Sequence, residues 1–133
     1  MEFVIKHFNE LSTTELYEIL KTRSEIFVVE QDCVYQDLDD KDQDAIHVFC
    51  WNDAGRVAGC LRVFWKDHDE AAGVAQIGRV VTLEHGKGIG GQMLHEGVRI
   101  AVDPRLFRII TNVSGGFFLN AYSHILQPKN KSL

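Results

Sequence analysis

The chain has 133 residues, of which 45% are hydrophobic and 25% charged, and these values are ordinary for a single soluble globular domain spanning residues 1–133. Its 19 acidic residues outnumber the 14 basic ones, and the formal net charge of −5 argues against a nucleic-acid partner and favours cationic partners such as amines. No apolar run approaches the roughly 20 residues that a membrane span needs, so we expect no membrane partner.

The N-terminal part of the sequence predicts one strand and one helix. "EFVIKHF" (2–8) alternates apolar and polar residues, which is typical of a strand and not of a secretory signal peptide. The stretch "STTE" at 12–15 is a capping-box pattern, and helical spacing of apolar residues follows it, so we predict a helix over about 13–26. Without a secretory signal, Cys33, Cys50 and Cys60 are expected to be free thiols in the cytoplasm.

The next segment loses its periodicity and is rich in aspartate, which predicts a loop or a broken helix with solvated carboxylates. Two β-rich runs follow, "IHVFCW" and "RVAGCLRVFW", and the turn-forming "NDAG" between them predicts a hairpin. A fourth strand is predicted over 74–82, after a second turn. Because these connections are too short for crossovers, strands two to four are expected to be antiparallel.

The C-terminal third predicts a helix to about Val102, closed by Asp103–Pro104, then a fifth strand over 106–113 and a last helix in "FFLNAYSHIL". The fifth strand follows a helix and can therefore run parallel to the fourth. The expected order is β, α, β, β, β, α, β, α, which is an α+β fold with a mixed, mainly antiparallel sheet.

Four glycines are crowded into "HGKGIGGQM" (85–93), at the corner between the fourth strand and the following helix. A tight corner needs only one or two of them. The stretch fits the dinucleotide fingerprint G-x-G-x-x-G, but the acidic residue that should end the next strand is absent, and a Walker loop would need G-K-S/T. Bare N–H groups at a helix N-terminus suit a phosphate or pyrophosphate, and His85 and Lys87 could add positive charge.

"IGRVVT…GKGIGGQML" resembles motif A of the GNAT N-acetyltransferase superfamily, with Gly88 and Gly90 on the glycine positions and His85 on the Arg/Gln position. "RSEIFVVEQDCVYQDLDDKD", followed by His47, resembles the ElaA-type branch. Together the two segments cover roughly residues 15–102. The resemblance implies the GNAT fold, whose mainly antiparallel sheet is flanked by helices in the order already predicted.

The resemblance also implies acetyl-CoA as the donor, with its pyrophosphate on the glycine-rich turn and its pantetheine arm along Val80–Thr82 as an added strand. The donor-binding residues it implies are Val80, Val81, Thr82, His85, Gly86, Lys87, Gly88, Ile89, Gly90 and Gly91. A small-molecule or peptide amine, once deprotonated, would attack the thioester directly. Neither a metal nor a covalent intermediate is required.

The implied catalytic candidates are Glu30 and Tyr35, facing the acceptor amine, and Tyr122, in place of the family's tyrosine after the fifth strand. Glu30 and Tyr35 could equally belong to a capped loop with a half-buried tyrosine. A zinc site built from His47, Cys50, Cys60 and His68 is disfavoured, because strand positions three apart point to opposite faces.

The C-terminus departs from the family pattern, because no Gly-Phe follows Tyr122 and the last strand or strands of the sheet are expected to be missing. A partner subunit in a homodimer could supply the absent strand, or the tail could fold in another way. The sequence therefore predicts an acetyl-CoA-dependent N-acetyltransferase, and the alternative is a non-catalytic CoA-binding or interaction module. A third hypothesis is a nucleotide-binding regulator that uses the same loop.

Overall fold

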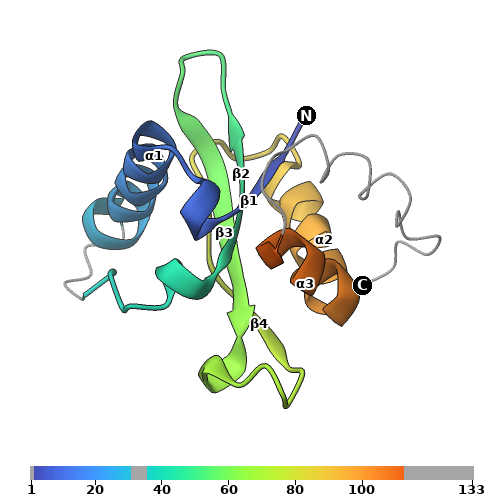
Figure 1. Ribbon diagram of the computed structural model, residues 1–133. Helices are drawn as coiled ribbons and strands as arrows, with labels where there is room; N and C mark the ends of the chain where they lie inside the picture. The colour runs from blue at the N-terminus through green and yellow to red at the C-terminus, as the bar shows by residue number, and fades with distance from the viewer. Residues whose placement is uncertain (1, 31–35, 113–133) are drawn as a thin grey trace.

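A four-stranded antiparallel sheet in the order β1-β2-β3-β4 lies at the centre of the computed structural model, which describes residues 2–30 and 36–112 (Figure 1). The strands are β1 (Val4–His7), β2 (Ile46–Trp51), β3 (Val57–Trp65) and β4 (Ala75–Thr82). Helix α1 (Thr13–Ser24) covers one face of the sheet, and α2 (Ile89–Ala101) and α3 (Pro104–Asn112) cover the other (Figure 1). Four short helical segments complete the described chain: η1 (Phe8–Glu10), η2 (Glu25–Glu30), η3 (Asp42–Asp44) and η4 (Lys66–His68).

Alternation along β2 and β3 divides the interior into two layers. Ile46, Val48, Leu61 and Val63 face α2 and α3, and they pack with Met93, Ile100, Leu106, Phe107 and Ile110. The intervening residues Phe49 and Cys60 face α1 and pack with Ile19, Ile26, Val57 and Val81. Because successive strand residues point to opposite faces, one hairpin supplies both cores.

The predicted start of α1 is confirmed. The Glu15 N–H donates to Ser12 Oγ at 3.0 Å, and the Ser12 N–H donates to Glu15 Oε1 at 2.8 Å, which completes the capping box. The predicted hairpin, the fourth strand and the helix after the glycines are confirmed as β2–β3, β4 and α2. The aspartate-rich segment is broken helix where it is described, with η2 before it and η3 within it.

The predicted fifth strand over 106–113 is wrong, because residues 104–112 form α3. Asp103 begins this helix: its Oδ1 accepts hydrogen bonds from the Arg105 N–H at 3.0 Å and the Leu106 N–H at 3.3 Å. Pro104 then occupies the first helical position, which proline favours. Leu106, Phe107 and Ile110 are buried with helical spacing, so tertiary packing overrides the β-branched composition.

The α+β class with an antiparallel sheet flanked by helices is therefore confirmed, but no parallel strand is present among residues 2–30 and 36–112. The predicted last helix, Tyr122 and the expected missing C-terminal strands all concern residues outside the described ranges. Among the described helices, none has the length and apolar character needed to cross a membrane.

If Asp103 caps α3, then Asp103→Ala should lower the free energy of unfolding by about 1 kcal/mol, because two N–H groups lose their acceptor. Asp103→Asn keeps an accepting oxygen and should remain within a few tenths of wild type. Urea denaturation measures both values. Equal stability of the alanine variant and wild type would contradict the cap.

Candidate functional site

The turn between β4 and α2 contains backbone that only glycine adopts easily. Gly86 has φ +80° and Gly88 has φ +72°, and Gly88 is the N-cap of α2 without any side-chain cap. The Gln92 N–H donates to the Gly88 carbonyl at 3.1 Å. The N–H groups of Ile89, Gly90 and Gly91 precede this bond and have no acceptor within the helix. They carry the positive end of the helix dipole.

The same turn has open space over its glycines. A Cβ placed on Gly86 or Gly91 would meet no atom within 4 Å, and one on Gly90 would lie 3.6 Å from Thr82 Cγ2. His85 and Lys87 are exposed, and Lys87 Nζ lies 3.7 Å from Glu84 Oε2. The described residues therefore leave free space over Gly86 and Gly91, and N–H groups at a helix N-terminus favour an anion.

Strand β4 carries a bulge in its middle. Cys60 pairs with Val81 and Arg62 pairs with Gly78, so Arg79 and Val80 together lie opposite Leu61. Arg79 has φ +52°, which is unusual for a residue with a side chain. Within the described ranges β4 is an edge strand, and Val80 is 41% exposed. An edge of this kind can pair with an extended chain that carries amide groups.

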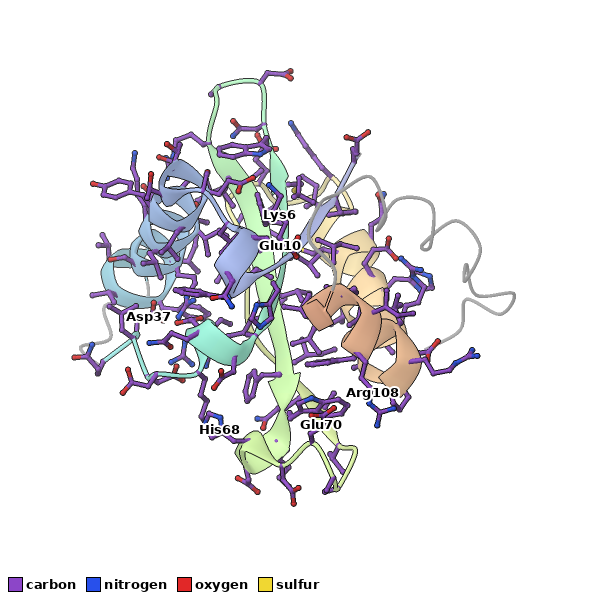
Figure 2. The ribbon with its side chains drawn as sticks, in the orientation of Figure 1. Lys6, Glu10, Asp37, His68, Glu70 and Arg108 are labelled. Carbon is purple, nitrogen blue, oxygen red and sulfur yellow. The ribbon has the colours of Figure 1, made fainter. Side chains whose placement is uncertain are left out.

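The Arg79 side chain connects the bulge to the aspartate-rich segment. Its Nε donates to Asp37 Oδ1 at 2.8 Å, and a terminal nitrogen donates to the Asp37 carbonyl at 2.9 Å. The same nitrogen lies 3.3 Å from Asp39 Oδ2. Asp37 lies beside α1 in Figure 2, so these bonds join the edge strand to the layer that contains α1.

Two buried arginines extend this network inward. Arg23 of α1 is 1% exposed and donates to Asp42 Oδ1 at 2.6 Å, and its Nε lies 3.1 Å from Asp37 Oδ2. Arg62 of β3 is 2% exposed and donates to Asp39 Oδ1 at 2.7 Å and to Asp42 Oδ1 at 3.1 Å. We call Arg23, Asp37, Asp39, Asp42, Arg62 and Arg79 the ion-pair network.

The network corrects the prediction of a solvated acidic loop. Asp40 and Asp44 are exposed as predicted, but Asp42 is buried and Asp39 is partly buried. The hydrogen bond from Arg62 outweighs burial and lowers the pKa of Asp39 well below its usual range. Burial alone would raise the pKa of Asp42, but hydrogen bonds and charge from Arg23 and Arg62 lower it. Both carboxylates are thus held ionised.

His47 and the cysteines lie in the interior. His47 is 1% exposed, its Nε2 lies 3.0 Å from the Asp42 carbonyl, and burial lowers its pKa. Cys50 and Cys60 are buried free thiols, and burial raises the pKa of Cys60 to about 12. In the described part of the chain, no three His, Cys, Asp or Glu side chains are grouped so that they could hold a metal ion.

The structure brings together the predicted donor-binding residues, which run from Val80 to Thr82 in β4 and from His85 to Gly91 in the turn and first helical residues. Glu30 is the last residue of η2, and its side chain is not described. Tyr35 and Tyr122 lie outside the described residues. The arginines of the network are not identified from the sequence. Arg23 occupies an otherwise apolar stripe of its helix, and this placement is the signal from which its burial could be predicted.

The model of the acetyltransferase (GNAT) family matches residues 13–115 of this chain. Protein ElaA of Escherichia coli is 39% identical over 92 residues, which cover 66% of this chain and 58% of that protein. A UPF0039 protein of Schizosaccharomyces pombe is 38% identical over 81 residues, covering 61% of this chain and 51% of that protein. The chain thus spans a little over half the length of these curated relatives.

Solved structures resemble the fold over a larger share of the chain. An acyl-CoA N-acyltransferase from Pseudomonas aeruginosa has a TM-score of 0.67 and 36% identity, covering 75% of this chain and 69% of that one. The crystal structure of Escherichia coli ElaA has a TM-score of 0.68 and 32% identity, covering 75% and 68% of the two chains.

The network predicts acid sensitivity. Asp39 and Asp42 have lowered folded pKa values, so their contribution to stability is complete above the unfolded pKa of about 3.9 and is lost as the pH falls through the folded values. The lowered pKa of His47 acts in the same direction below about pH 6.5, because the unfolded chain binds the proton more tightly. The free energy of unfolding should therefore fall from pH 7 to pH 3 in urea titrations.

Asp42→Asn should lower the free energy of unfolding at pH 7 by about 3 kcal/mol, since it leaves two buried guanidinium groups short of charge, and it should flatten the acid dependence. Asp40→Asn is the matched control, because Asp40 is exposed and asparagine tolerates its φ of +64°. Wild-type stability that does not change between pH 7 and pH 3 would contradict the network.

Proposed function

The chain belongs to the GNAT acetyltransferase family, and from this premise we propose that it transfers the acetyl group of acetyl-CoA to an amine. Its relationship to the ElaA-type branch is confirmed by the ElaA sequence and structure matches. The observation that carries the proposal is the glycine-rich turn at the start of α2, where the first N–H groups of the helix have no side-chain cap and lie next to a bulged strand that is an edge among the described residues. In this reaction acetyl-CoA is a substrate that is consumed in each turnover.

The turn suits the diphosphate of the donor because it combines N–H donors with the helix dipole. The edge of β4 around Val80, Val81 and Thr82 suits the pantetheine arm, whose amides can complete the unpaired backbone groups of the strand. His85 and Lys87 are exposed beside the turn and can add positive charge. No residue with a fixed negative charge occurs between His85 and Gly91.

The reaction needs a neutral amine, whereas an alkyl amine is almost wholly protonated at pH 7. A carboxylate or an ordered water must remove a proton before the nitrogen attacks the thioester carbonyl. The nitrogen, now bonded to the carbonyl carbon, loses its second proton as the C–S bond breaks, and the leaving thiolate takes up a proton. Backbone N–H groups at the β4 bulge are proposed to polarise the carbonyl as it becomes an oxyanion.

Glu30, Tyr35 and Tyr122 remain the proposed catalytic candidates, with Glu30 and Tyr35 on the acceptor side and Tyr122 as the proton donor to the thiolate. Asp39 and Asp42 are poor candidates for the base, because the arginines lower their pKa values and occupy their oxygens. We propose a small-molecule or peptide amine as the acceptor, a cytoplasmic location and a homodimer as the assembly.

Gly90→Asp tests the diphosphate site. The backbone at Gly90 has ordinary helical geometry and a Cβ there meets only Thr82 Cγ2 at 3.6 Å, so the variant should fold. A carboxylate in the first turn favours the helix itself. The melting temperature of the ligand-free variant should therefore hold, whereas its affinity for CoA should fall at least about tenfold through repulsion of the diphosphate.

Gly90→Asn is the matched control, because it adds the same volume without charge and should retain most of the affinity. Isothermal titration with CoA measures both variants. Unchanged CoA affinity in Gly90→Asp would contradict the diphosphate site.

A thiol-release assay with acetyl-CoA and a panel of amines separates the enzyme from a non-catalytic CoA-binding module, since only the enzyme releases thiol. Stabilisation by ATP as strong as that by CoA would favour a nucleotide-binding regulator.

A further inference from the structure

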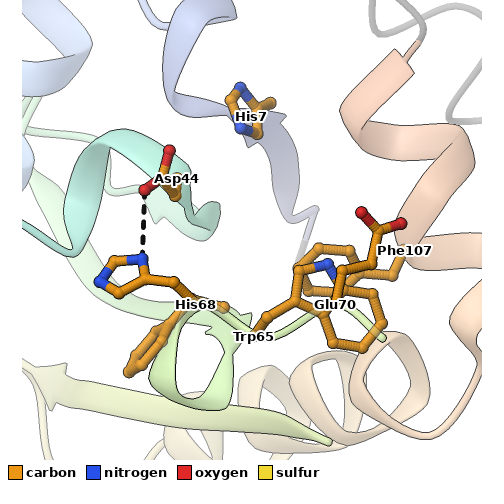
Figure 3. A pocket seen from close by; sticks show the side chains of 7 residues that line it. His7, Asp44, Trp65, His68, Glu70 and Phe107 are labelled. Carbon is orange, nitrogen blue, oxygen red and sulfur yellow. Dashed lines mark ion pairs between the residues drawn. The ribbon is translucent and has the colours of Figure 1, made fainter. Parts of the chain in front are cut away.

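A hollow of about 450 Å³ lies at the end of the sheet opposite to the glycine-rich turn. It borders Phe64 and Trp65 at the end of β3, which pair with the first residues of β4, whereas the turn follows the last residue of β4. Its lining is drawn from β1, η3, the end of β3, the β3–β4 connection and α3 (Figure 3): His7, Asp44, Phe64, Trp65, His68, Glu70 and Phe107. The volume is within the usual range for small-molecule sites.

One wall of the hollow is aromatic. The rings of Trp65 and Phe107 lie 4.3 Å apart between centroids, with their planes tilted by 36°. The Phe64 ring already has two cations over it, the Arg62 guanidinium at 5.1 Å and the Lys41 ammonium at 5.5 Å. Phe107 is itself only 1% exposed, so the partly exposed Trp65 provides the aromatic surface that remains for a ligand.

The mouth of the hollow carries two carboxylates. Asp44 Oδ2 lies 3.3 Å from His68 Nδ1, and Glu70 Oε1 lies 3.3 Å from Arg108 Nε. Glu70 and Arg108 lie side by side in Figure 2, at the base of the molecule as drawn. All four side chains are more than half exposed, and ion pairs of this kind contribute only about 0–1 kcal/mol. An incoming cation can therefore take the place of His68 at Asp44 or of Arg108 at Glu70.

His7 adds no positive charge to the hollow. Burial lowers its pKa, and its Nδ1 accepts a hydrogen bond from the Asn9 N–H at 3.3 Å, so this nitrogen carries no proton. The lining thus combines two carboxylates with an aromatic wall. Among the described side chains no group is found that could hold a metal ion.

We propose that this hollow binds an organic cation, namely an amine with an aromatic or apolar body, whose ammonium lies between the Asp44 and Glu70 carboxylates on opposite sides of the hollow (Figure 3) and whose body packs on Trp65. Charge attraction and cation–π contact with the indole both favour such a ligand. The proposal rests on the hollow alone and does not depend on acetyl transfer.

The fluorescence of Trp65 tests the proposal. Trp51 lies at the far end of β2, beside Phe49, so Trp51→Phe leaves Trp65 as the reporter. We expect saturable quenching by phenethylamine at millimolar concentrations, with 2-phenylethanol, its neutral analogue, binding at least about fivefold more weakly. Asp44→Asn and Glu70→Gln should each weaken phenethylamine binding about threefold, and together they should reduce its affinity to that of the alcohol.

Asp53→Asn is the matched control, because Asp53 is an exposed carboxylate in the turn between β2 and β3 and should leave the affinity unchanged. The mutated side chains are more than half exposed, and thermal denaturation verifies that the variants fold. Equal affinity for the amine and the alcohol, or no saturable change up to about 10 mM amine, would overturn the proposal. A charge-dependent shift of the Trp65 indole NMR signal would support it independently.

Discussion

The contacts of Arg79 with Asp37 and Asp39 are the constraint on which the candidate site depends. Arg79 is one of two residues that oppose Leu61, and its backbone has a conformation that side chains rarely adopt. Its guanidinium is held by a carboxylate and a carbonyl of Asp37 at 2.8 and 2.9 Å. The bonds compensate for backbone strain of about 1–3 kcal/mol and fix where β4 leaves the regular ladder. They also connect the edge strand to the segment that precedes β2.

The ion-pair network, in which Arg23, Asp42 and Arg62 are buried, does not by itself explain the stability of the fold. Ion pairs with Arg23 and Arg62 must overcome the cost of removing these nearly inaccessible guanidinium groups from water. Apolar side chains of similar size at such positions often give a protein the same stability. The network instead determines geometry, because each carboxylate is shared between two arginines at defined distances. On the opposite face, Gly97 allows close packing, since a Cβ there would lie 3.0 Å from Leu61 Cδ2. The sheet is thus held from both sides, and among the described residues β4 is left as an edge strand.

Local signals in the sequence were sufficient for most elements. The capping box at Ser12 and Glu15, the β-rich runs of β2 and β3 with the turn-forming residues between them, and the glycines at the corner before α2 each act over a few residues, and the elements that they predict are confirmed. The α3 helix was missed because Asp103–Pro104 was interpreted as a stop, although aspartate followed by proline also starts helices. The ion-pair network was missed because Arg79 and Asp37 are 42 positions apart, and no local pattern indicates such a pair. Amino-acid type alone favours solvated aspartates, and only the fold shows which of them turn inward.

The two ends of β4 differ in the ligands that their residues suit. The end toward α2 presents backbone N–H groups, and the end toward the β3–β4 connection borders carboxylates and aromatic rings. Titration of ¹⁵N-labelled protein with CoA, and separately with pantetheine, tests the diphosphate site most directly. We expect CoA to shift the amide signals of Gly86 to Gly91 and of Val80 to Thr82, whereas pantetheine, which lacks the diphosphate, should shift only those of β4. Shifts confined to other parts of the chain, or the same shifts with both ligands, would contradict a diphosphate site at the start of α2.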